Sequence, residues 1–72
     1  MRENHTLADR LRARSDQLGL APAHVAEMAG VNRSFVYDIL RGRSSRPGID
    51  RLADIARVLK VDRDWLIHGI GE

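Results

Sequence analysis

The sequence predicts an all-α domain of five short helices. Apolar residues recur at helical spacing along most of the chain, and glycine, proline and capping residues interrupt them at short intervals. No stretch shows the alternating, β-branched pattern that is typical of a strand. A chain of 72 residues has room for one core. Because it has no cysteine, helix packing or a partner subunit must stabilise that core.

The first helix is expected over about residues 7–18. Leu7, Leu11 and Leu18 recur at helical spacing, and Thr6 followed by Asp9 resembles a capping box. Gly19 then stands where a helix often ends in a left-handed residue.

The second helix is expected to begin at Pro22, which suits a first turn because its missing N–H would have no partner there. Val25, Met28 and Ala29 are expected to form its apolar face, and Gly30 to end it.

The third helix is expected to follow Asn32, a good N-cap. Val36, Ile39 and Leu40 are expected to point inward, and Gly42 to end the helix.

A polar, Arg- and Ser-rich segment from Arg41 to Gly48 lacks helical periodicity and separates the third helix from the last two. The fourth helix is marked by a regular apolar stripe of Ile49, Leu52, Ile55, Ala56 and Leu59. The fifth is expected to be capped by Asp62 and to carry Trp65, Leu66 and Ile70.

Residues 22–42 therefore form a helix, a tight turn with glycine, and a second helix. Small or apolar residues stand where such a unit needs them: Ala26 at the helix crossing, Gly30 and Val31 in the turn, Val36 and Ile39 beneath the second helix. In the segments LGL, VAEMAGVNRSFVYDILRG, RP and VDRDWLIHG, the chain resembles the lambda-repressor-like (Cro/CI, XRE-type) helix-turn-helix family over about residues 6–70.

This resemblance implies a sequence-specific DNA-binding domain, normally a transcriptional repressor of phage or prophage type, whose third helix lies in the major groove of a palindromic operator. The residues expected to read bases are Arg33, Ser34, Tyr37 and Asp38. Arg33 is suited to bond guanine O6 and N7 together. For Asp38 two roles are open, accepting a bond from cytosine or orienting Arg33 or Arg41.

The expected phosphate contacts are His24, Asn32, Arg41, Arg43, Ser44, Ser45 and Arg46. Eleven of the twelve basic residues are arginines, a bias that suits nucleic acid but that codon usage also explains. Position favours DNA, because residues 32–48 hold four arginines and one aspartate, a net charge of +3, against +2 for the whole chain.

A homodimer is expected to form through Trp65, Ile67 and Ile70, since apolar residues cover more than one stripe of the last helix. A contact with a further C-terminal domain is the alternative. Residues 1–72 are accordingly expected to be a single helix-turn-helix domain, either complete or the N-terminal part of a longer repressor.

No catalytic, cofactor or metal site is expected. His5, His24 and His68 lack the spacing of metal ligands, and short helices offer no oxyanion hole for the scattered serines and aspartates. No apolar run is long enough to cross a membrane. The resemblance implies a bacterial or phage-encoded protein, expected in the cytoplasm and at the nucleoid.

Three other functions stay open: a restriction-modification controller, the DNA-binding subunit of an antitoxin, and a helix-turn-helix scaffold that binds protein. Two features keep the last one open. Many relatives carry a phosphate-binding Gln where this chain has Pro22, and the carboxylate of Asp38 would be repelled by phosphate.

Overall fold

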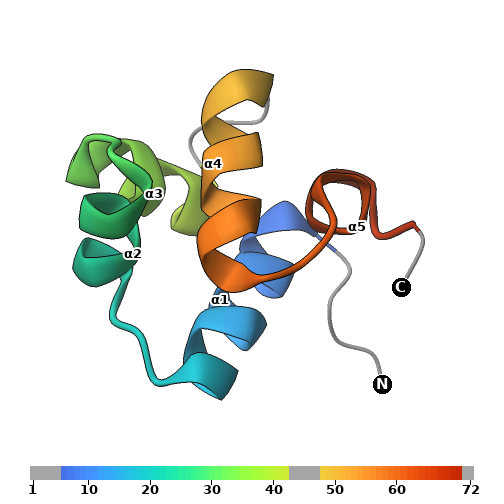
Figure 1. Cartoon of the computed structure of the whole chain (residues 1–72), viewed down its shortest axis with the longest axis horizontal. Coiled ribbons are helices and arrows are strands. Elements are labelled where there is room, and N and C mark those ends of the chain that lie inside the picture. The colour runs from blue at the N-terminus through green and yellow to red at the C-terminus, as the bar shows by residue number, and fades with distance from the viewer. Residues whose placement is uncertain (1–5, 43–47, 71–72) are drawn as a thin grey trace.

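Five helices follow one another in the described part of the chain (Figure 1). The structure, a computed structural model, describes residues 6–42 and 48–70. Its helices are α1 (Leu7–Leu18), α2 (Pro22–Ala29), α3 (Arg33–Leu40), α4 (Ile49–Leu59) and α5 (Arg63–His68). Within these residues there is no strand, and no helix is long and apolar enough to cross a membrane. The predicted all-α class is confirmed.

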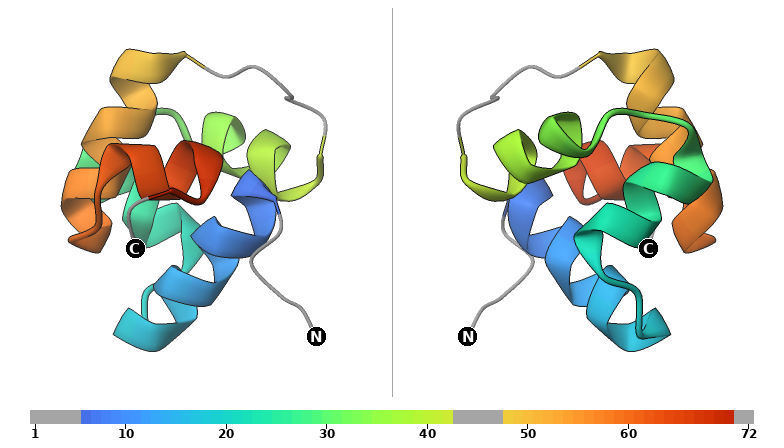
Figure 2. Two further views of the ribbon diagram at one scale, coloured as in Figure 1. Left: turned by 90° about the vertical axis from the view of Figure 1, so that its right-hand side faces the viewer. Right: turned by 90° about the vertical axis from the view of Figure 1, so that its left-hand side faces the viewer.

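The helices are arranged around α4, with α2 and α3 to one side of it and α5 to the other (Figure 1). Figure 2 shows α2 and α3 from one side and α5 from the opposite side. Among the described helices, α1 is the one whose backbone lies close to all four others. The backbone of α3 lies close to α1 and α2, and α3 contacts α4 through its side chains, because the guanidinium of Arg51 lies over the ring of Phe35, 5.6 Å from its centroid. The side of α3 that carries Arg33, Ser34 and Arg41 is left exposed.

Local capping fixes where the helices begin. The Oγ1 of Thr6 accepts a hydrogen bond from the backbone N–H of Asp9 at 3.1 Å, and the Oδ1 of Asn32 accepts one from the N–H of Ser34 at 3.1 Å. Asp62 does occupy the N-cap position of α5, but its side chain makes no capping bond, so the predicted cap is present in position only.

The core consists of side chains that are at most 2% exposed: Leu11, Val25, Ala26, Val36, Ile39, Leu52, Ile55, Ala56, Leu59 and Leu66. Two residues expected in the core are on the surface instead, Met28 at 53% and Ile49 at 60% exposure. Met28 is turned away because α2 packs through Val25, Ala26 and Ala29, and residue 28 lies outside that arc. Ile49 lies in the first turn of α4, which projects beyond the other helices (Figure 1).

The end of the chain also differs from expectation. Ile70, expected on the fifth helix, lies beyond it, because α5 ends at His68 and Gly69 adopts a left-handed conformation with φ of 76°. Ile70 is 62% exposed.

Three arginines of α1 hydrogen-bond to the carboxyl-terminal ends of three other helices. Arg10 donates from Nε to the carbonyl of Leu66 and from Nη2 to that of Ile67, both at 2.8 Å, at the end of α5. Arg14 donates from Nε to the carbonyl of Leu59 at the end of α4, at 2.8 Å. A cation at a helix C-terminus binds carbonyls that have no partner within the helix and offsets the negative end of the helix dipole.

The third of these arginines, Arg12, donates from Nη2 to the carbonyl of Leu40 at 3.3 Å, at the end of α3.

Arg10 is the most buried of the three, at 4% exposure, and burial lowers the pKa of its guanidinium while nearby Asp9 opposes that shift. An arginine remains protonated at neutral pH, so α1 presents a permanent positive charge to α5.

Candidate nucleic-acid interface

The pair α2 and α3 is held by its turn. Gly30 has a φ of 74°, which glycine adopts without steric cost. The N–H groups of Gly30 and Val31 donate to the carbonyls of Glu27 and Ala26, at 3.2 and 3.0 Å, and Val31 packs against the core. These bonds close the last turn of α2 and fix the direction in which α3 leaves it.

One side of α3 anchors the helix and the other is open. Val36 and Ile39 are buried, whereas no described residue on the opposite side is buried. That outward side holds Arg33, Ser34, Tyr37, Asp38 and Arg41, of which Tyr37 and Asp38 are half-buried and the other three exposed. The structure therefore brings all four expected base-reading residues and one expected phosphate contact onto a single helix surface.

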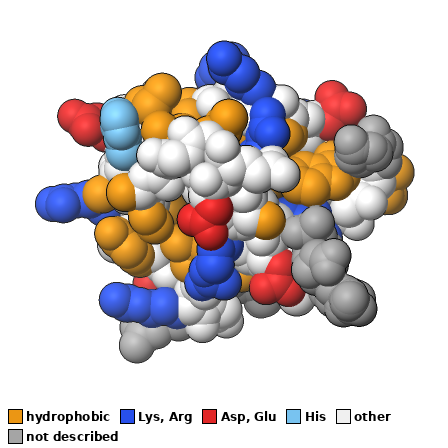
Figure 3. Space-filling view, turned by 90° about the horizontal axis from the view of Figure 1, so that it is seen from below, with side chains coloured by type: hydrophobic (Ala, Val, Ile, Leu, Met, Phe, Trp, Pro, Cys, Tyr) orange, Lys and Arg blue, Asp and Glu red, His pale blue; other side chains and the backbone are white. Residues whose placement is uncertain are grey.

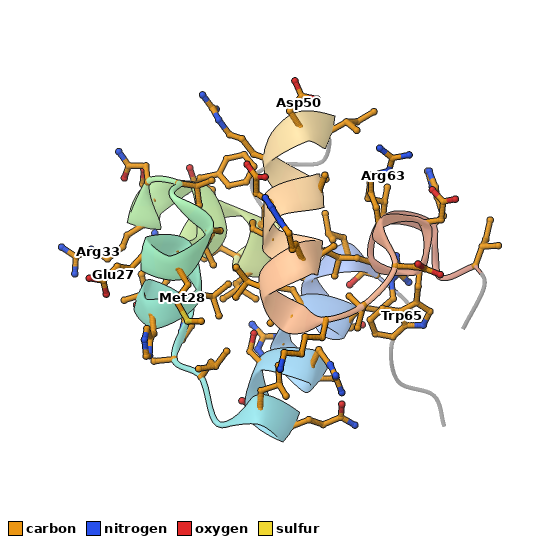
Figure 4. All side chains as sticks on the ribbon, viewed as in Figure 1. Glu27, Met28, Arg33, Asp50, Arg63 and Trp65 are labelled. Carbon is orange, nitrogen blue, oxygen red and sulfur yellow. The ribbon has the colours of Figure 1, made fainter. Side chains whose placement is uncertain are left out.

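Arg33 stands at the edge of this surface next to Glu27 of α2 (Figure 4). Both residues line a shallow hollow between α2 and α3, together with His24. His24 is exposed, so an expected phosphate contact lies beside the expected reader of guanine. Glu27 was not expected here, although its position three residues before Gly30 places it in the last turn before α3.

Asn32 and Ser34 are linked to each other at the start of α3. Besides the capping bond, the hydroxyl of Ser34 donates to the Oδ1 of Asn32 at 3.0 Å. The oxygen of Asn32 thus accepts two bonds within the chain, which leaves its amide nitrogen to donate outward and the lone pairs of Ser34 to accept.

Within the described residues, Asp38 forms no ion pair with Arg33 or Arg41, the arginines that one of its two open roles would have it orient. The ion pairs of the described residues are Arg57 with Asp54 and Arg63 with Asp64, and neither involves Asp38. The guanidinium of Arg41 lies instead over the ring of Tyr37, 5.9 Å from its centroid. Four of the expected phosphate contacts, Arg43, Ser44, Ser45 and Arg46, lie outside the described residues, as does His5.

The residues expected at a dimer contact lie at and beyond α5, on the other side of α4 from α3 (Figures 1 and 4). Trp65 and Ile67 are half-buried against the core, and Ile70 is exposed. The face that includes α1 and its connection to α2 carries basic and acidic side chains interspersed, with apolar patches between them (Figure 3).

Comparison with known proteins establishes the family. The model of one protein family, described as helix-turn-helix domain, matches residues 6–66. The chain belongs to the helix-turn-helix domain family. This helix-turn-helix domain is of the lambda-repressor-like, XRE type, so the resemblance seen in the sequence is confirmed.

Solved structures agree with this assignment. The domain superposes on the N-terminal DNA-binding domain of SinR from Bacillus subtilis with a TM-score of 0.86 and 28% identity, covering 94% of this chain and 99% of that one. The P22 c2 repressor, solved with a synthetic operator, gives a TM-score of 0.78 at 25% identity, over 89% and 96% of the two chains. The restriction-modification controller C.AhdI from Aeromonas hydrophila shares the fold, with a TM-score of 0.78 at 23% identity over 89% and 96%.

Proposed function

We propose that this helix-turn-helix domain binds double-stranded DNA sequence-specifically as a transcription regulator of repressor type, with α3 in the major groove. The observation that carries the proposal is the outward side of α3, where Arg33, Ser34, Tyr37, Asp38 and Arg41 stand together on the second helix of the helix-turn-helix unit. The structure of SinR in complex with DNA supports the proposal, because it matches this chain with a TM-score of 0.81 at 28% identity.

Direct readout is assigned mainly to Arg33. Its exposed guanidinium has the planar fork that matches guanine O6 and N7, a pairing that discriminates by about 1–3 kcal/mol. Ser34 and Asp38 are the further candidates for base contacts. Asn32, His24 and Arg41 surround them and are the candidates for phosphate contacts, with Arg43, Ser44, Ser45 and Arg46 following in the sequence.

The proposed binding unit is a homodimer on a palindromic operator, formed through Trp65, Ile67 and Ile70. Ile70 is exposed and follows the helix that carries half-buried Trp65, which supports a contact at this end of the molecule. DNA as the partner would place the protein at the nucleoid, in the cytoplasm.

Selection of bound sites from random duplexes tests the function directly. A palindrome whose half-sites are about one helical turn apart is the expected product. Affinity should also fall with salt: if Arg41, Arg43 and Arg46 each neutralise one phosphate, log K against log salt has a slope of about −2.7 for each bound copy. Absence of any bound duplex would contradict the proposal and favour a scaffold that binds protein.

Arg33→Ala tests the assignment of readout. We expect it to lower affinity for the selected site by about 1–3 kcal/mol and to relax preference at one base pair of each half-site, while binding to random duplexes changes little. Arg43→Ala should weaken binding to all sequences alike. If Arg33→Ala instead weakens selected and random duplexes equally, Arg33 contacts phosphate and another residue reads the base.

A further inference from the structure

Tyr37 and Arg41 form a cation–π pair on the outward side of α3. They are separated by one helical turn, so their side chains lie on the same side of the helix. The guanidinium carbon of Arg41 lies 5.9 Å from the centroid of the Tyr37 ring, within the range of a cation–π contact. Tyr37 is half-buried whereas Arg41 is exposed, so the ring is the more fixed of the two partners.

The backbone of Arg41 is also held in place. Its N–H donates to the carbonyl of Tyr37 at 2.9 Å, and the N–H of Gly42 donates to that of Ile39 at 3.0 Å, which closes the end of α3. Arg12 of α1 binds the carbonyl of Leu40, the residue just before. With the backbone fixed, the position of the Arg41 guanidinium depends on its own rotamers, and the contact with the Tyr37 ring favours the one seen here.

We propose that Tyr37 is a positioning residue that holds Arg41 for a DNA phosphate, and that it is not a base reader. The five N–H donors of a guanidinium lie in its plane, so a ring against one face leaves all of them available to phosphate oxygens. A side chain ordered before binding loses less entropy when it binds. The proposal rests on the proposed function, DNA binding, and assigns Tyr37 to affinity for DNA of any sequence.

The alternative role of Tyr37 makes opposite predictions. A tyrosine that reads a base acts through its hydroxyl or its contact with a thymine methyl group. Replacing it lowers affinity only for duplexes that carry the recognised base. A ring that positions Arg41 needs no hydroxyl. Replacing it lowers affinity for duplexes of every sequence, provided that Arg41 is present.

A double-mutant cycle separates these roles. Affinities of the wild-type protein, Tyr37→Leu, Arg41→Ala and the double variant are measured on the selected operator and on a random-sequence duplex of the same length. We expect Tyr37→Leu to weaken both duplexes by about two- to five-fold for each bound copy, and to have no further effect in the Arg41→Ala background. Tyr37→Phe should bind within about two-fold of wild type, because Phe retains a ring that can stack.

Arg57→Ala serves as the charge-matched control, since Arg57 lies on α4 and pairs with Asp54. The positioning role would be overturned if Tyr37→Leu lowered affinity for the selected operator only, or if it lowered affinity equally in the wild-type and Arg41→Ala backgrounds. DNA binding would remain established in either case. A wild-type protein that binds neither duplex would overturn the proposed function as well. Circular dichroism of each variant checks that it folds, and Tyr37→Phe tests the role of the hydroxyl even if Tyr37→Leu unfolds.

Discussion

Lys60 ends α4 in a left-handed conformation, with φ of 61°. The ends of α1, α2 and α5 use glycine for the same conformation, at Gly19, Gly30 and Gly69. For a residue with a Cβ atom this region costs about 1–2 kcal/mol, because the Cβ approaches the following carbonyl oxygen. The fold nevertheless requires it, since the N–H groups of Lys60 and Val61 close the last turn of α4.

Lys60→Gly should therefore stabilise the domain. We expect the free energy of unfolding to rise by about 0.5–1 kcal/mol, the relief of strain less the extra freedom that glycine gives the unfolded chain. Urea denaturation followed by circular dichroism measures it. Gly19→Ala is the reverse control and should lower stability by a similar amount. Loss of stability in Lys60→Gly would show that the strain relieved is smaller than the entropy that glycine adds to the unfolded chain.

Local signals were the most predictable part of the structure. Thr6 and Asn32 as caps, and Gly19 and Gly30 as ends, follow from chemistry within a few residues, so the sequence alone sufficed. Lys60 gave no such signal, because nothing in the type of residue marks a left-handed lysine. The exposure of Met28 depends on how α2 packs on its neighbours, which is a tertiary property.

At the scale of elements, the arginines of α1 act as caps for helices that are distant in sequence. Arg10 binds two carbonyls at the end of α5 in a nearly buried setting, whereas Arg12 makes one longer bond at an exposed position. Hydrogen bonds from charged groups to buried acceptors contribute more than exposed ones, and a buried acceptor left without a donor costs about 1–3 kcal/mol.

Arg10→Met should consequently lower the free energy of unfolding by about 2–4 kcal/mol, because methionine keeps the apolar part of the side chain but leaves the carbonyls of Leu66 and Ile67 without these donors. Arg12→Met, the matched substitution on the same helix, should cost less than about 1 kcal/mol. Chemical denaturation of both variants provides the measurement. Equal losses would mean that the burial of Arg10 does not strengthen its bonds.

These roles could not be predicted from the sequence. In the sequence, DNA binding and codon usage both explain the excess of arginine. For Arg10, Arg12 and Arg14 the structure shows a third explanation, since they bind carbonyls at the ends of other helices. Their acceptors are backbone carbonyls, which every residue has, so no partner is marked in the sequence. The outward side of α3 was predictable, because helical spacing alone assigns Val36 and Ile39 to one side and Arg33, Ser34, Tyr37, Asp38 and Arg41 to the other.

At the scale of the whole molecule, the two proposed surfaces lie on different sides of α4. α3 lies to one side of α4 and α5 to the other (Figure 1), and Ile70 follows α5 by two residues. A substitution at Ile70 is therefore expected to alter self-association without disturbing the outward side of α3.

Ile70→Glu should shift the protein toward monomer, because it introduces a charge into a proposed apolar contact while changing no core side chain. Sedimentation velocity over a range of concentrations measures this. Met28→Glu is the control, since Met28 is also more than half exposed but lies on α2. An unchanged sedimentation coefficient for folded Ile70→Glu, in a wild-type protein that does dimerise, would place the contact elsewhere.

The bonds between Arg10 and α5 have a consequence for synthesis of the protein. The donors and acceptors are separated by 56 and 57 residues, so this closure joins the first described helix to the last. During synthesis α1 leaves the ribosome first, yet Arg10 has no α5 to bind until residue 67 has left the exit tunnel. Folding of the nascent chain should accordingly finish only after all of the described domain has been synthesised, and contacts that distant in sequence are slow to form.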